Sequence, residues 1–322
     1  MRTTVGGPYH SPMLPTVDTN DELDAMVSDE TLLRPAALDL CTRLGLVGLP
    51  LRRFDEGSLP VYAVGGDMVL KLYPRFEVAE AIREARVLDH LWGQLPLPTP
   101  RLHATDEYAN GWRFVLMSRL PGLSVAEAWP RLTGAEQDRI ISESAQTLAA
   151  LHAMDFKPLT DIVGPSDWSA FLRRQRARVL QQHSTNGVTE PWLSLIPGFL
   201  DSVPLPASTE LALLHTEFMR EHLTIDMRDG RRLTGLFDFE PVMIGDPAYD
   251  FASTGLFVTR GDARQLRRFY EAYGRAPHDP DQLLAYTLLH VYSDLPLYMH
   301  QLPTPAEPRL DVLAEMWFST RG

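Results

Sequence analysis

Residues 51–73, LRRFDEGSLPVYAVGGDMVLKLY, decide the fold class of the first part of the chain. Three short runs of strand-forming residues, LRRF, VYAV and MVLKLY, are separated by the turn formers DEGS (55–58) and GGD (65–67). Apolar or alternating runs bounded by Gly, Asp and Ser are typical of strands joined by tight turns. The stretch therefore predicts three consecutive strands.

The residues that follow extend this pattern. EVAEAIREARVLDHLWG (77–93) has helical spacing and ends at a glycine, and a Pro-rich break separates it from two further strand patterns, RLHATDEY (101–108) and WRFVLMSRL (112–120). The order β-β-β-α-β-β predicts an antiparallel sheet with one helix. Before the sheet, the apolar spacing over 32–44 predicts an amphipathic helix, and the Gly-, Pro- and Thr-rich residues 1 to about 20 predict a loose arm.

From about residue 123 the pattern is mostly helical. Two short strand-like runs, LALLH with LTID (211–226) and RLTGLFDF (232–239), interrupt it. The predicted helices are 124–132, 135–154, 167–182, 263–274, 281–302 and 310–318. The predicted fold is α+β, with a small antiparallel-sheet lobe and a larger helical lobe. The expected divisions are an N-terminal arm and helix (1–49), a sheet lobe with its hinge (50–122) and a helical lobe (123–322).

Composition and charge narrow the class of protein. The 322 residues carry a net charge of -12, with 44% hydrophobic and 22% charged residues, as in a folded protein of two lobes. The absence of a Lys/Arg-rich block argues against nucleic acid as a partner. The single Cys41 excludes an intrachain disulfide, and we see neither a signal peptide nor a membrane span. We expect a cytoplasmic protein that is a monomer or a homodimer.

Lys71 is notable because the chain has 28 Arg but only two Lys. It lies in the middle of the apolar run MVLKLY, where a compact ammonium could reach a phosphate as a point charge. The alternative is an edge-strand lysine that points to solvent. Glu77, Glu80 and Glu84 in the following helix are possible partners, and Glu84, within the apolar pattern, is the preferred one.

A second group of candidates lies in LLHTEFMREHLTID (213–226) and GLFDFE (235–240). His215, Glu217 and His222 follow one apolar strand and Asp238 ends another, so the four side chains are expected to converge. The spacing matches no common zinc motif, which argues against a metalloprotease. The alternative is a polar loop with satisfied histidines.

Two more aspartates follow in GDPAYDFA (245–252). Asp246 precedes Pro247 and is a suitable helix N-cap, so a structural role is expected for it. Asp250, inside the helix, is expected either to bond to the loop that carries His215 or to lie on a solvated face.

Six segments together resemble the aminoglycoside phosphotransferase family, which has the two-lobed fold of protein kinases. They are VYAVGGDMVLKLY, REARVLDHLW, FVLMSRLPG, TLAALHAMD, LLHTEFMREHLTID and GLFDFEPVMIGDPAYDFA, in the family's order from about residue 50 to 255. The resemblance implies that Lys71 holds the α- and β-phosphates of ATP or GTP and that Glu84 orients it.

The resemblance also assigns the rest of the nucleotide site. The hinge would bind the base through the backbone of Ser118, Arg119 and Leu120, and Gly57 and Ser58 would lie at the loop over the phosphates. That loop lacks the G-x-G-x-x-G of protein kinases.

The catalytic loop departs from the family's pattern of His-Gly-Asp, four residues and Asn. Here the positions are His215-Thr216-Glu217 and His222. The resemblance implies that Glu217 orients and deprotonates the acceptor hydroxyl and that Asp238 binds the metal. Mg²⁺ prefers oxygen ligands, so an imidazole at His222 is an unusual replacement.

Three interpretations of this loop follow. The enzyme could use Mg²⁺, with His222 as a weaker ligand or as a hydrogen-bond donor to phosphate; it could prefer Mn²⁺; or it could bind a nucleotide without turnover. Because Lys71, Glu84, a carboxylate at Glu217 and Asp238 are all retained, we favour an active enzyme.

The acceptor side is expected in the C-terminal helices. Arg220, in the loop, could meet the γ-phosphate or an acceptor carboxylate; the alternative is a solvated loop arginine. The candidate acceptor residues are more aromatic than acidic: Tyr286, His290, Tyr292, Asp294, Tyr298, His300, Asp311, Glu315, Trp317 and Phe318. We therefore expect a Mg²⁺-dependent kinase of a small-molecule hydroxyl that confers antibiotic resistance, acting on an aminoglycoside, a macrolide or a nucleoside-type (capuramycin-like) antibiotic. The alternatives are a silent nucleotide-binding pseudokinase and a metabolic kinase of a sugar, choline or homoserine-like hydroxyl.

Overall fold

The computed structural model describes residues 14–321 except positions 56, 207–209 and 229. These residues form two compact units. The first comprises the residues up to Trp92 together with Pro100–Leu120, and the second comprises Gly93–Thr99 together with the residues from Pro121 onward. The chain thus leaves the first unit after its last helix and returns to it for two more strands.

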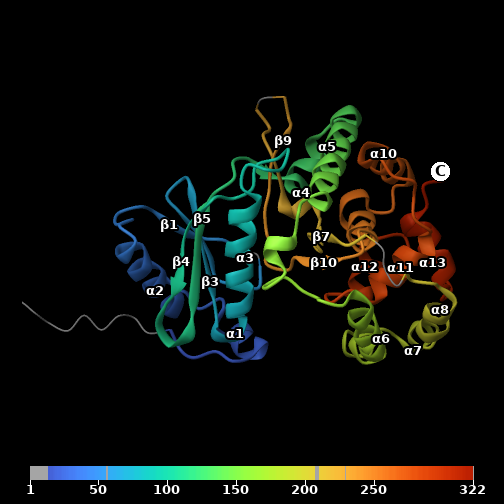
Figure 1. Ribbon diagram of the computed structural model, residues 1–322, viewed down its shortest axis with the longest axis horizontal. Coiled ribbons are helices and arrows are strands. Elements are labelled where there is room, and N and C mark those ends of the chain that lie inside the picture. Colours follow the sequence, from blue (N-terminus) through green and yellow to red (C-terminus); the bar gives the residue numbers. More distant parts are fainter. Residues whose placement is uncertain (1–13, 56, 207–209, 229, 322) are drawn as a thin grey trace, which may run out of the picture. The chain divides into compact units, whose positions relative to one another are not determined.

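A five-stranded antiparallel sheet forms the centre of the first unit (Figure 1). Its strands, in spatial order, are β1 (Leu51–Arg53), β2 (Val61–Val64), β3 (Met68–Tyr73), β5 (Arg113–Ser118) and β4 (Leu102–Glu107). Lys71 is opposite Val61 of β2 and Val115 of β5. The predicted β-β-β-α-β-β order is confirmed, and Lys71 lies on a central strand rather than on an edge.

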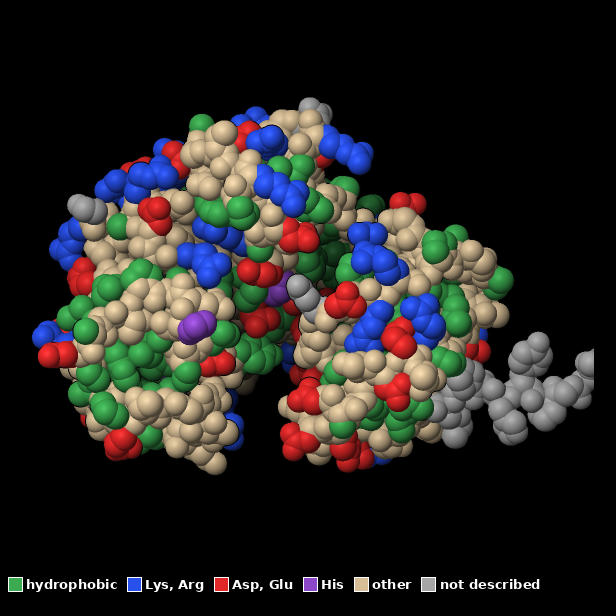
Figure 2. Space-filling model, turned by 180° about the vertical axis from the view of Figure 1, so that it is seen from behind, with side chains coloured by type: hydrophobic (Ala, Val, Ile, Leu, Met, Phe, Trp, Pro, Cys, Tyr) green, Lys and Arg blue, Asp and Glu red, His purple; other side chains and the backbone are tan. Residues whose placement is uncertain are grey.

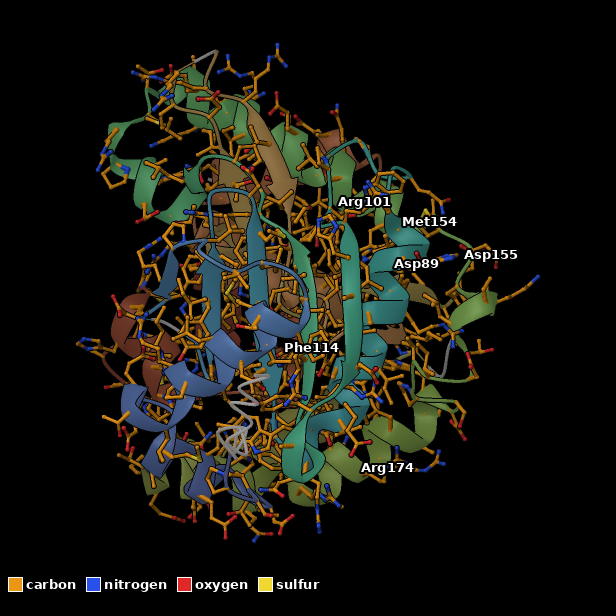
Figure 3. The ribbon with its side chains drawn as sticks, turned by 90° about the vertical axis from the view of Figure 1, so that its left-hand side faces the viewer. Asp89, Arg101, Phe114, Met154, Asp155 and Arg174 are labelled. Atoms are coloured by element: carbon orange, nitrogen blue, oxygen red, sulfur yellow. The ribbon has the colours of Figure 1, made fainter. Side chains whose placement is uncertain are left out.

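Helices cover the two faces of this sheet (Figure 1). Because successive side chains of a strand point to opposite faces, Lys71 is directed to one helix, α3 (Val78–Leu91), and Leu70 to the other side. Tyr62, opposite Leu70, donates its hydroxyl to Glu30 of α2 (Glu30–Arg43) at 2.7 Å. Figure 3 looks at the α2 side, with Phe114 of β5 and Asp89 of α3 labelled.

The segment before α2 is packed rather than loose where the structure describes it. Residues 1–13 of the predicted arm lie outside the described residues, but Leu14 and Val17 are buried. The carbonyl oxygens of Leu14 and Pro15 accept hydrogen bonds from the side chains of Asn110 and Trp112 at 2.6 and 2.7 Å. A short helix, α1 (Asn20–Met26), follows. The prediction of a loose arm was wrong for 14–20, because these apolar side chains and carbonyls complete the β4–β5 turn.

The second unit is mainly helical (Figure 1). Its α-helices are α4 (Val125–Ala128), α5 (Gly134–His152), α6 (Trp168–Thr185), α7 (Glu190–Leu193), α8 (Ile196–Ser202), α9 (Ala248–Ser253), α10 (Ala263–Tyr273), α11 (Pro280–Leu288), α12 (Leu295–Gln301) and α13 (Leu310–Phe318). A π-helical segment, Thr254–Thr259, continues α9. The combination of an antiparallel sheet unit with a helical unit confirms the predicted α+β class.

Two small sheets hold the loops that carry the candidate residues. β7 (Ala212–Leu214) pairs with β10 (Met243–Gly245), and β8 (Leu223–Ile225) lies between β6 (Leu123–Ser124) and β9 (Leu233–Leu236). The β7–β8 connection contains His215, Glu217 and His222, and the β9–β10 connection contains Asp238. Because β8 pairs with β9, the end of the β7–β8 connection lies beside the start of the β9–β10 connection.

One predicted helix is in fact two. The pattern over 281–302 divides into α11 and α12, with a break at 289–294. The Asp294 side chain accepts a hydrogen bond from the backbone of Leu297 at 3.1 Å, and Pro296 lies in the first turn of α12. An N-cap Asp with Pro two residues later is a helix-start signal that the apolar periodicity concealed.

Ion pairs connect several elements of the helical unit. Acidic residues of α5 bind arginines of the β9 region and of α10: Arg231 to Glu136, Arg232 to Glu143 and Arg264 to Asp138. On the face drawn in Figure 2, Lys and Arg side chains are interspersed with Asp and Glu. Among the described residues, no helix has the length and apolarity needed to cross a membrane.

Candidate active site

A buried ion pair joins β3 and α3 in the first unit. Lys71 is 7% exposed and Glu84 is 1% exposed, and the Lys71 Nζ lies 3.6 Å from a carboxylate oxygen of Glu84. Tyr73, two residues further along β3, donates its hydroxyl to the same carboxylate. Because a buried charge is tolerated only when it is paired and hydrogen-bonded, Glu84 fixes the position of the Lys71 ammonium. Glu84, which the sequence favoured as the partner of Lys71, is therefore the residue that pairs with Lys71 in the structure.

The hinge candidates lie at the end of β5. The N–H of Ser118 donates to Arg101 O at 2.8 Å, and the N–H of Arg119 donates to Asp67 O at 2.7 Å. Both N–H groups are thus already used within the unit. A base bound here would be held through carbonyl oxygens or through the N–H of Leu120.

Gly57 and Ser58 lie in the exposed β1–β2 loop. Gly57 has a φ of 105°, a conformation that favours glycine. Its position at a loop tip is compatible with the expected place over phosphates, and this role stays a prediction.

Asp250 anchors the β7–β8 connection in the second unit. Its carboxylate accepts hydrogen bonds from the backbone N–H groups of His215 and Thr216 at 2.8 and 2.7 Å. His152 of α5 contacts the same carboxylate at 2.9 Å, and its other ring nitrogen contacts Tyr273 at 2.8 Å. Of the two roles considered for Asp250, the bond to the loop is therefore the correct one. Sequence reasoning missed His152 and Tyr273, which lie 98 and 23 residues away from Asp250 in the chain.

His215 ties the loop to the strand end that carries Asp238. It is fully buried, and its Nε2 bonds to the carbonyl oxygen of Phe237 at 3.1 Å. Because a carbonyl oxygen only accepts, Nε2 carries the proton. Burial lowers the pKa of His215 to about 4, so the ring is neutral near pH 7. The geometry assigns His215 a positioning contact rather than a proton transfer.

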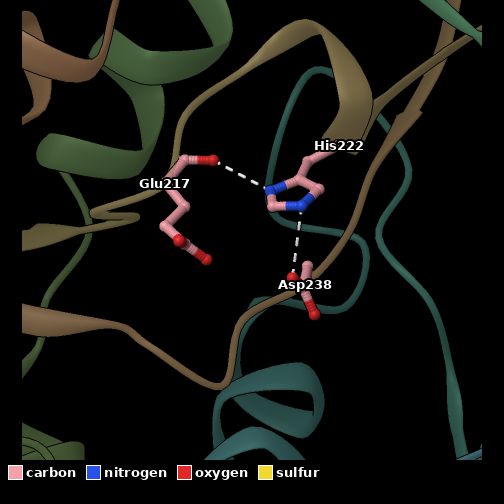
Figure 4. A group of neighbouring side chains, drawn as sticks. All are labelled: Glu217, His222 and Asp238. Atoms are coloured by element: carbon pink, nitrogen blue, oxygen red, sulfur yellow. Dashed lines mark hydrogen bonds and ion pairs between the residues drawn. The ribbon is translucent and has the colours of Figure 1, made fainter. Parts of the chain in front are cut away.

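Glu217, His222 and Asp238 converge, as Figure 4 shows. Their potential ligand atoms lie within 4.8 Å of one another. The His222 Nδ1 donates to the carbonyl oxygen of Glu217 at 2.9 Å, which directs Nε2 toward Asp238, 3.3 Å away. The sequence-based prediction that these three side chains meet is confirmed.

Two protonation states of the His222 ring fit this arrangement. With a neutral ring, Nε2 presents a lone pair to the Asp238 carboxylate, and two acceptors at 3.3 Å are stabilised by a cation that both can bind. With a protonated ring, His222 and Asp238 form an ion pair. The first state matches a metal centre of one imidazole and carboxylates, so these residues fit a divalent cation.

Two residues of these loops have strained backbones. Thr216 has a φ of 66° and Asp238 a φ of 72°, in a region that non-glycine residues rarely occupy. Thr216 is held there by Asp250, by its own hydroxyl bond to Pro241 O at 3.0 Å, and by Ser253, which donates to Thr216 O at 2.6 Å. Strain of this kind persists only where several surrounding contacts hold the conformation, and such residues cluster at functional sites.

Arg220 is buried away from the position that the sequence suggested. Its Nε donates to the carbonyl oxygen of Val258 at 2.7 Å, and its guanidinium lies 3.3 Å from the ring centre of Trp129. A further N–H reaches Gln265 at 3.4 Å. With its donors directed into the protein, Arg220 is placed to hold the loop rather than to meet a γ-phosphate.

The candidate acceptor residues separate into two groups. A pocket beside Glu217 is lined by His290, Tyr292, Asp294 and Tyr298. The other six do not line it: Tyr286 donates to Asp246 inside the core, Trp317 and Phe318 are buried, His300 is exposed, and Asp311 and Glu315 pair with arginines. Asp246 also accepts a hydrogen bond from the N–H of Ala248 at 2.9 Å; it has a structural role, although the N-cap residue of α9 is Pro247.

Comparisons with known proteins identify the family of the chain. The model of the phosphotransferase enzyme family matches residues 50–286, which is most of the chain. The chain belongs to this family. The family resemblance stated from the sequence is therefore confirmed.

Solved structures of phosphotransferases share the fold. The GDP and kanamycin complex of APH(2'')-IIIa is 18% identical with a TM-score of 0.67, over 80% of this chain and 87% of that chain. The streptomycin–ATP–APH(2'')-IIa ternary complex is 15% identical with a TM-score of 0.59, over 87% and 98%. A human protein, acyl-CoA dehydrogenase family member 11, is 24% identical over 164 residues, which are 50% of this chain and only 21% of that protein.

Proposed function

We propose that this phosphotransferase moves the γ-phosphate of a nucleoside triphosphate to a hydroxyl of a small molecule. The convergence of Glu217, His222 and Asp238 carries the proposal, because it brings a carboxylate base and metal ligands together on the loops of a family member. The buried pair of Lys71 and Glu84 supports it. Solved relatives in fold bind GDP with kanamycin or ATP with streptomycin, so ATP or GTP is the proposed donor and an antibiotic the proposed acceptor.

Each residue has a defined part in the proposed reaction. Glu217 accepts the proton of the acceptor hydroxyl as its oxygen bonds to the γ-phosphorus, and the bond from that phosphorus to the bridging oxygen breaks to release a nucleoside diphosphate. Lys71 neutralises charge on the donor phosphates, and Glu84 keeps its ammonium in place. The transition state is loose in most analyses, so positioning of the hydroxyl matters more than the strength of the base.

Asp238 and His222 are the proposed metal ligands. A divalent cation bound there would neutralise charge that develops on the phosphate oxygens. The hydrogen bond from Nδ1 to Glu217 O directs the His222 Nε2 toward the same point as the Asp238 carboxylate. Because Mn²⁺ accepts imidazole more readily than Mg²⁺ does, we expect activity with Mn²⁺ to equal or exceed that with Mg²⁺.

A transfer assay with ATP and with GTP against a panel of hydroxylated antibiotics tests the proposal. Asp238→Ala should abolish transfer, and Glu217→Ala should lower kcat with little change in nucleotide affinity. Glu271→Ala, at an exposed position of α10, is the matched control and should retain full activity. Full activity of Glu217→Ala would remove its assigned role.

The metal assignment has its own test. His222→Asn restores an oxygen ligand at this position, so the preferred metal should move from Mn²⁺ toward Mg²⁺. An unchanged metal preference would contradict ligation by His222 and leave it a purely structural residue.

A second candidate function is nucleotide binding without turnover. It is favoured by the 3.3 Å separation of His222 and Asp238, since an imidazolium–carboxylate pair would occupy the carboxylate that the metal needs. Measurable nucleotide binding with no transfer to any acceptor, with either metal, would establish this function in place of the first.

A further inference from the structure

A pocket of about 390 Å³ lies in the helical unit beside Glu217. Its walls come from the catalytic loop, the π-helical segment Thr254–Thr259 with the end of α9, and the stretch from the end of α11 through α12. All of these belong to one unit. The size suits a small organic molecule.

Several polar groups in these walls are already used within the protein. Ser253 donates to Thr216 O at 2.6 Å, and Tyr298 donates to Tyr292 O at 3.1 Å. Both ring nitrogens of His290 are engaged, one with Thr216 O and one with the N–H of Tyr292, each at 3.2 Å. These groups therefore have little donor capacity left for a ligand with many polar substituents.

What these walls present instead is apolar surface. Phe257 and Tyr298 pack edge to face, with ring centres 5.5 Å apart. Leu256 and Leu297 line the same pocket, and Leu297 is 43% exposed. Ring faces and alkyl groups of this kind stabilise an apolar ligand body.

The pocket has few carboxylates for a cationic ligand. Its acidic residues are Glu217, Glu221 and Asp294. Asp294 already caps α12 through the N–H of Leu297, and Glu217 is assigned to the hydroxyl. Because each ammonium group removed from water needs a partner, a polycation with four or more charges would leave some of its charges unpaired.

We propose that this pocket takes a hydroxylated acceptor with a largely uncharged aromatic or alicyclic body, and that it discriminates against polycationic aminosugars. The inference rests on the proposed function for the identity of the reaction, but it concerns only what the pocket binds. The hydroxyl lies toward Glu217 and the apolar body lies against Phe257, Tyr298 and Leu297.

Two probes test this assignment: naphthylethanol, a neutral aromatic alcohol, and kanamycin, a polycation. Binding of each is measured by calorimetry, and kcat/KM for transfer is measured with ATP and with GTP. We expect naphthylethanol to bind at least tenfold more tightly than kanamycin. We also expect Leu297→Asp, which adds a carboxylate to the pocket, to reduce this preference at least tenfold, whereas Leu38→Asp, at a 47%-exposed leucine of α2, leaves it unchanged.

The outcomes separate the two proposals. Tighter binding of kanamycin, no binding of naphthylethanol, or an unchanged preference in Leu297→Asp would overturn the pocket assignment, while transfer to kanamycin would leave the phosphotransferase function standing. Tight binding of naphthylethanol with no transfer to any hydroxyl would overturn the phosphotransferase function and support the pocket assignment.

Discussion

At the residue scale, Thr216 carries the clearest conflict between a side chain and its backbone. A β-branched residue at a φ of 66° is a genuine outlier, and it stands where the resembled family has glycine. Three groups hold it: the Asp250 carboxylate, the carbonyl oxygen of Pro241 and the hydroxyl of Ser253. The strain fixes the direction of Glu217, the next residue in the chain.

Comparing Gly with Ala at position 216 isolates this strain. Both variants lose the Thr216 hydroxyl bond, but only Gly relaxes at positive φ, so Thr216→Gly should be more stable than Thr216→Ala by about 1 kcal/mol. Urea unfolding of the two variants measures the difference. At Thr224 in β8, which lacks a positive φ, the order should reverse, with Ala more stable than Gly. Equal stabilities of the two variants at 216 would show that the loop stores no strain there.

Some residue-scale features could be predicted from the sequence and others could not. Lys71 and Glu84 were predictable because a lone lysine in an apolar strand needs a partner, and an acidic residue in an apolar helical pattern supplies one. The burial of Arg220 could not be predicted, since Val258 and Trp129, which enclose it, are distant in sequence and carry no signal of the contact. Backbone strain at Asp238 likewise has no sequence signature, and strain at Thr216 has none beyond the departure from the family's glycine.

At the element scale, strands and long helices followed the apolar periodicity closely, whereas irregular elements did not. The π-helical segment Thr254–Thr259 was not predicted; it packs closely against α13, where a Cβ on Gly255 would lie 2.5 Å from the ring of Phe318. Short helices such as α7 and α8 were also missed, since four to seven residues give too little periodicity to recognise. π-helical turns are frequent at functional sites, and this one lines the pocket beside Glu217.

Arg220 links the catalytic loop to this π-helical segment, and its replacement tests a positioning role. Arg220→Lys retains the charge but loses the stacking on Trp129 and the fork of donors to Val258 O and Gln265. We expect a loss of about 1–3 kcal/mol in the free energy of unfolding, a lower kcat and an unchanged KM for the nucleotide. Urea unfolding and steady-state kinetics measure these three quantities.

Arg228→Lys, at an exposed position after β8, is the matched control and should change none of them. If Arg220 instead contacted the γ-phosphate, as the sequence alone suggested, Arg220→Lys would raise the nucleotide KM without lowering stability. The two roles therefore predict opposite patterns for the same substitution.

At the scale of the whole molecule, several histidines are buried in the neutral state within the helical unit. Burial lowers the pKa of both His215 and His290 to about 4, and it lowers the pKa of His183 as well. In the unfolded chain these rings have the ordinary pKa of histidine, about 6.5. Between pH 6.5 and about 4 the unfolded chain consequently binds more protons than the folded protein, so stability falls as the pH is lowered through this range.

His290 allows this linkage to be measured at one site. As a neutral ring it donates from Nε2 to Thr216 O and accepts at Nδ1 from the N–H of Tyr292, so a second proton would remove the acceptor and place a charge in a buried position. His290→Gln keeps an amide donor and an acceptor but does not titrate. Its free energy of unfolding should fall less steeply than that of the wild type from pH 6.5 to 4. The two slopes should differ by at most the contribution of one bound proton, about 1.4 kcal/mol per pH unit. Urea unfolding across this pH range measures both slopes, and His300→Gln, at an exposed position of α12, should match the wild type. If the unfolding free energies of His290→Gln and the wild type instead changed in parallel with pH, His290 would take up its proton without cost in the folded protein. That outcome would contradict the role given to its burial and its two hydrogen bonds.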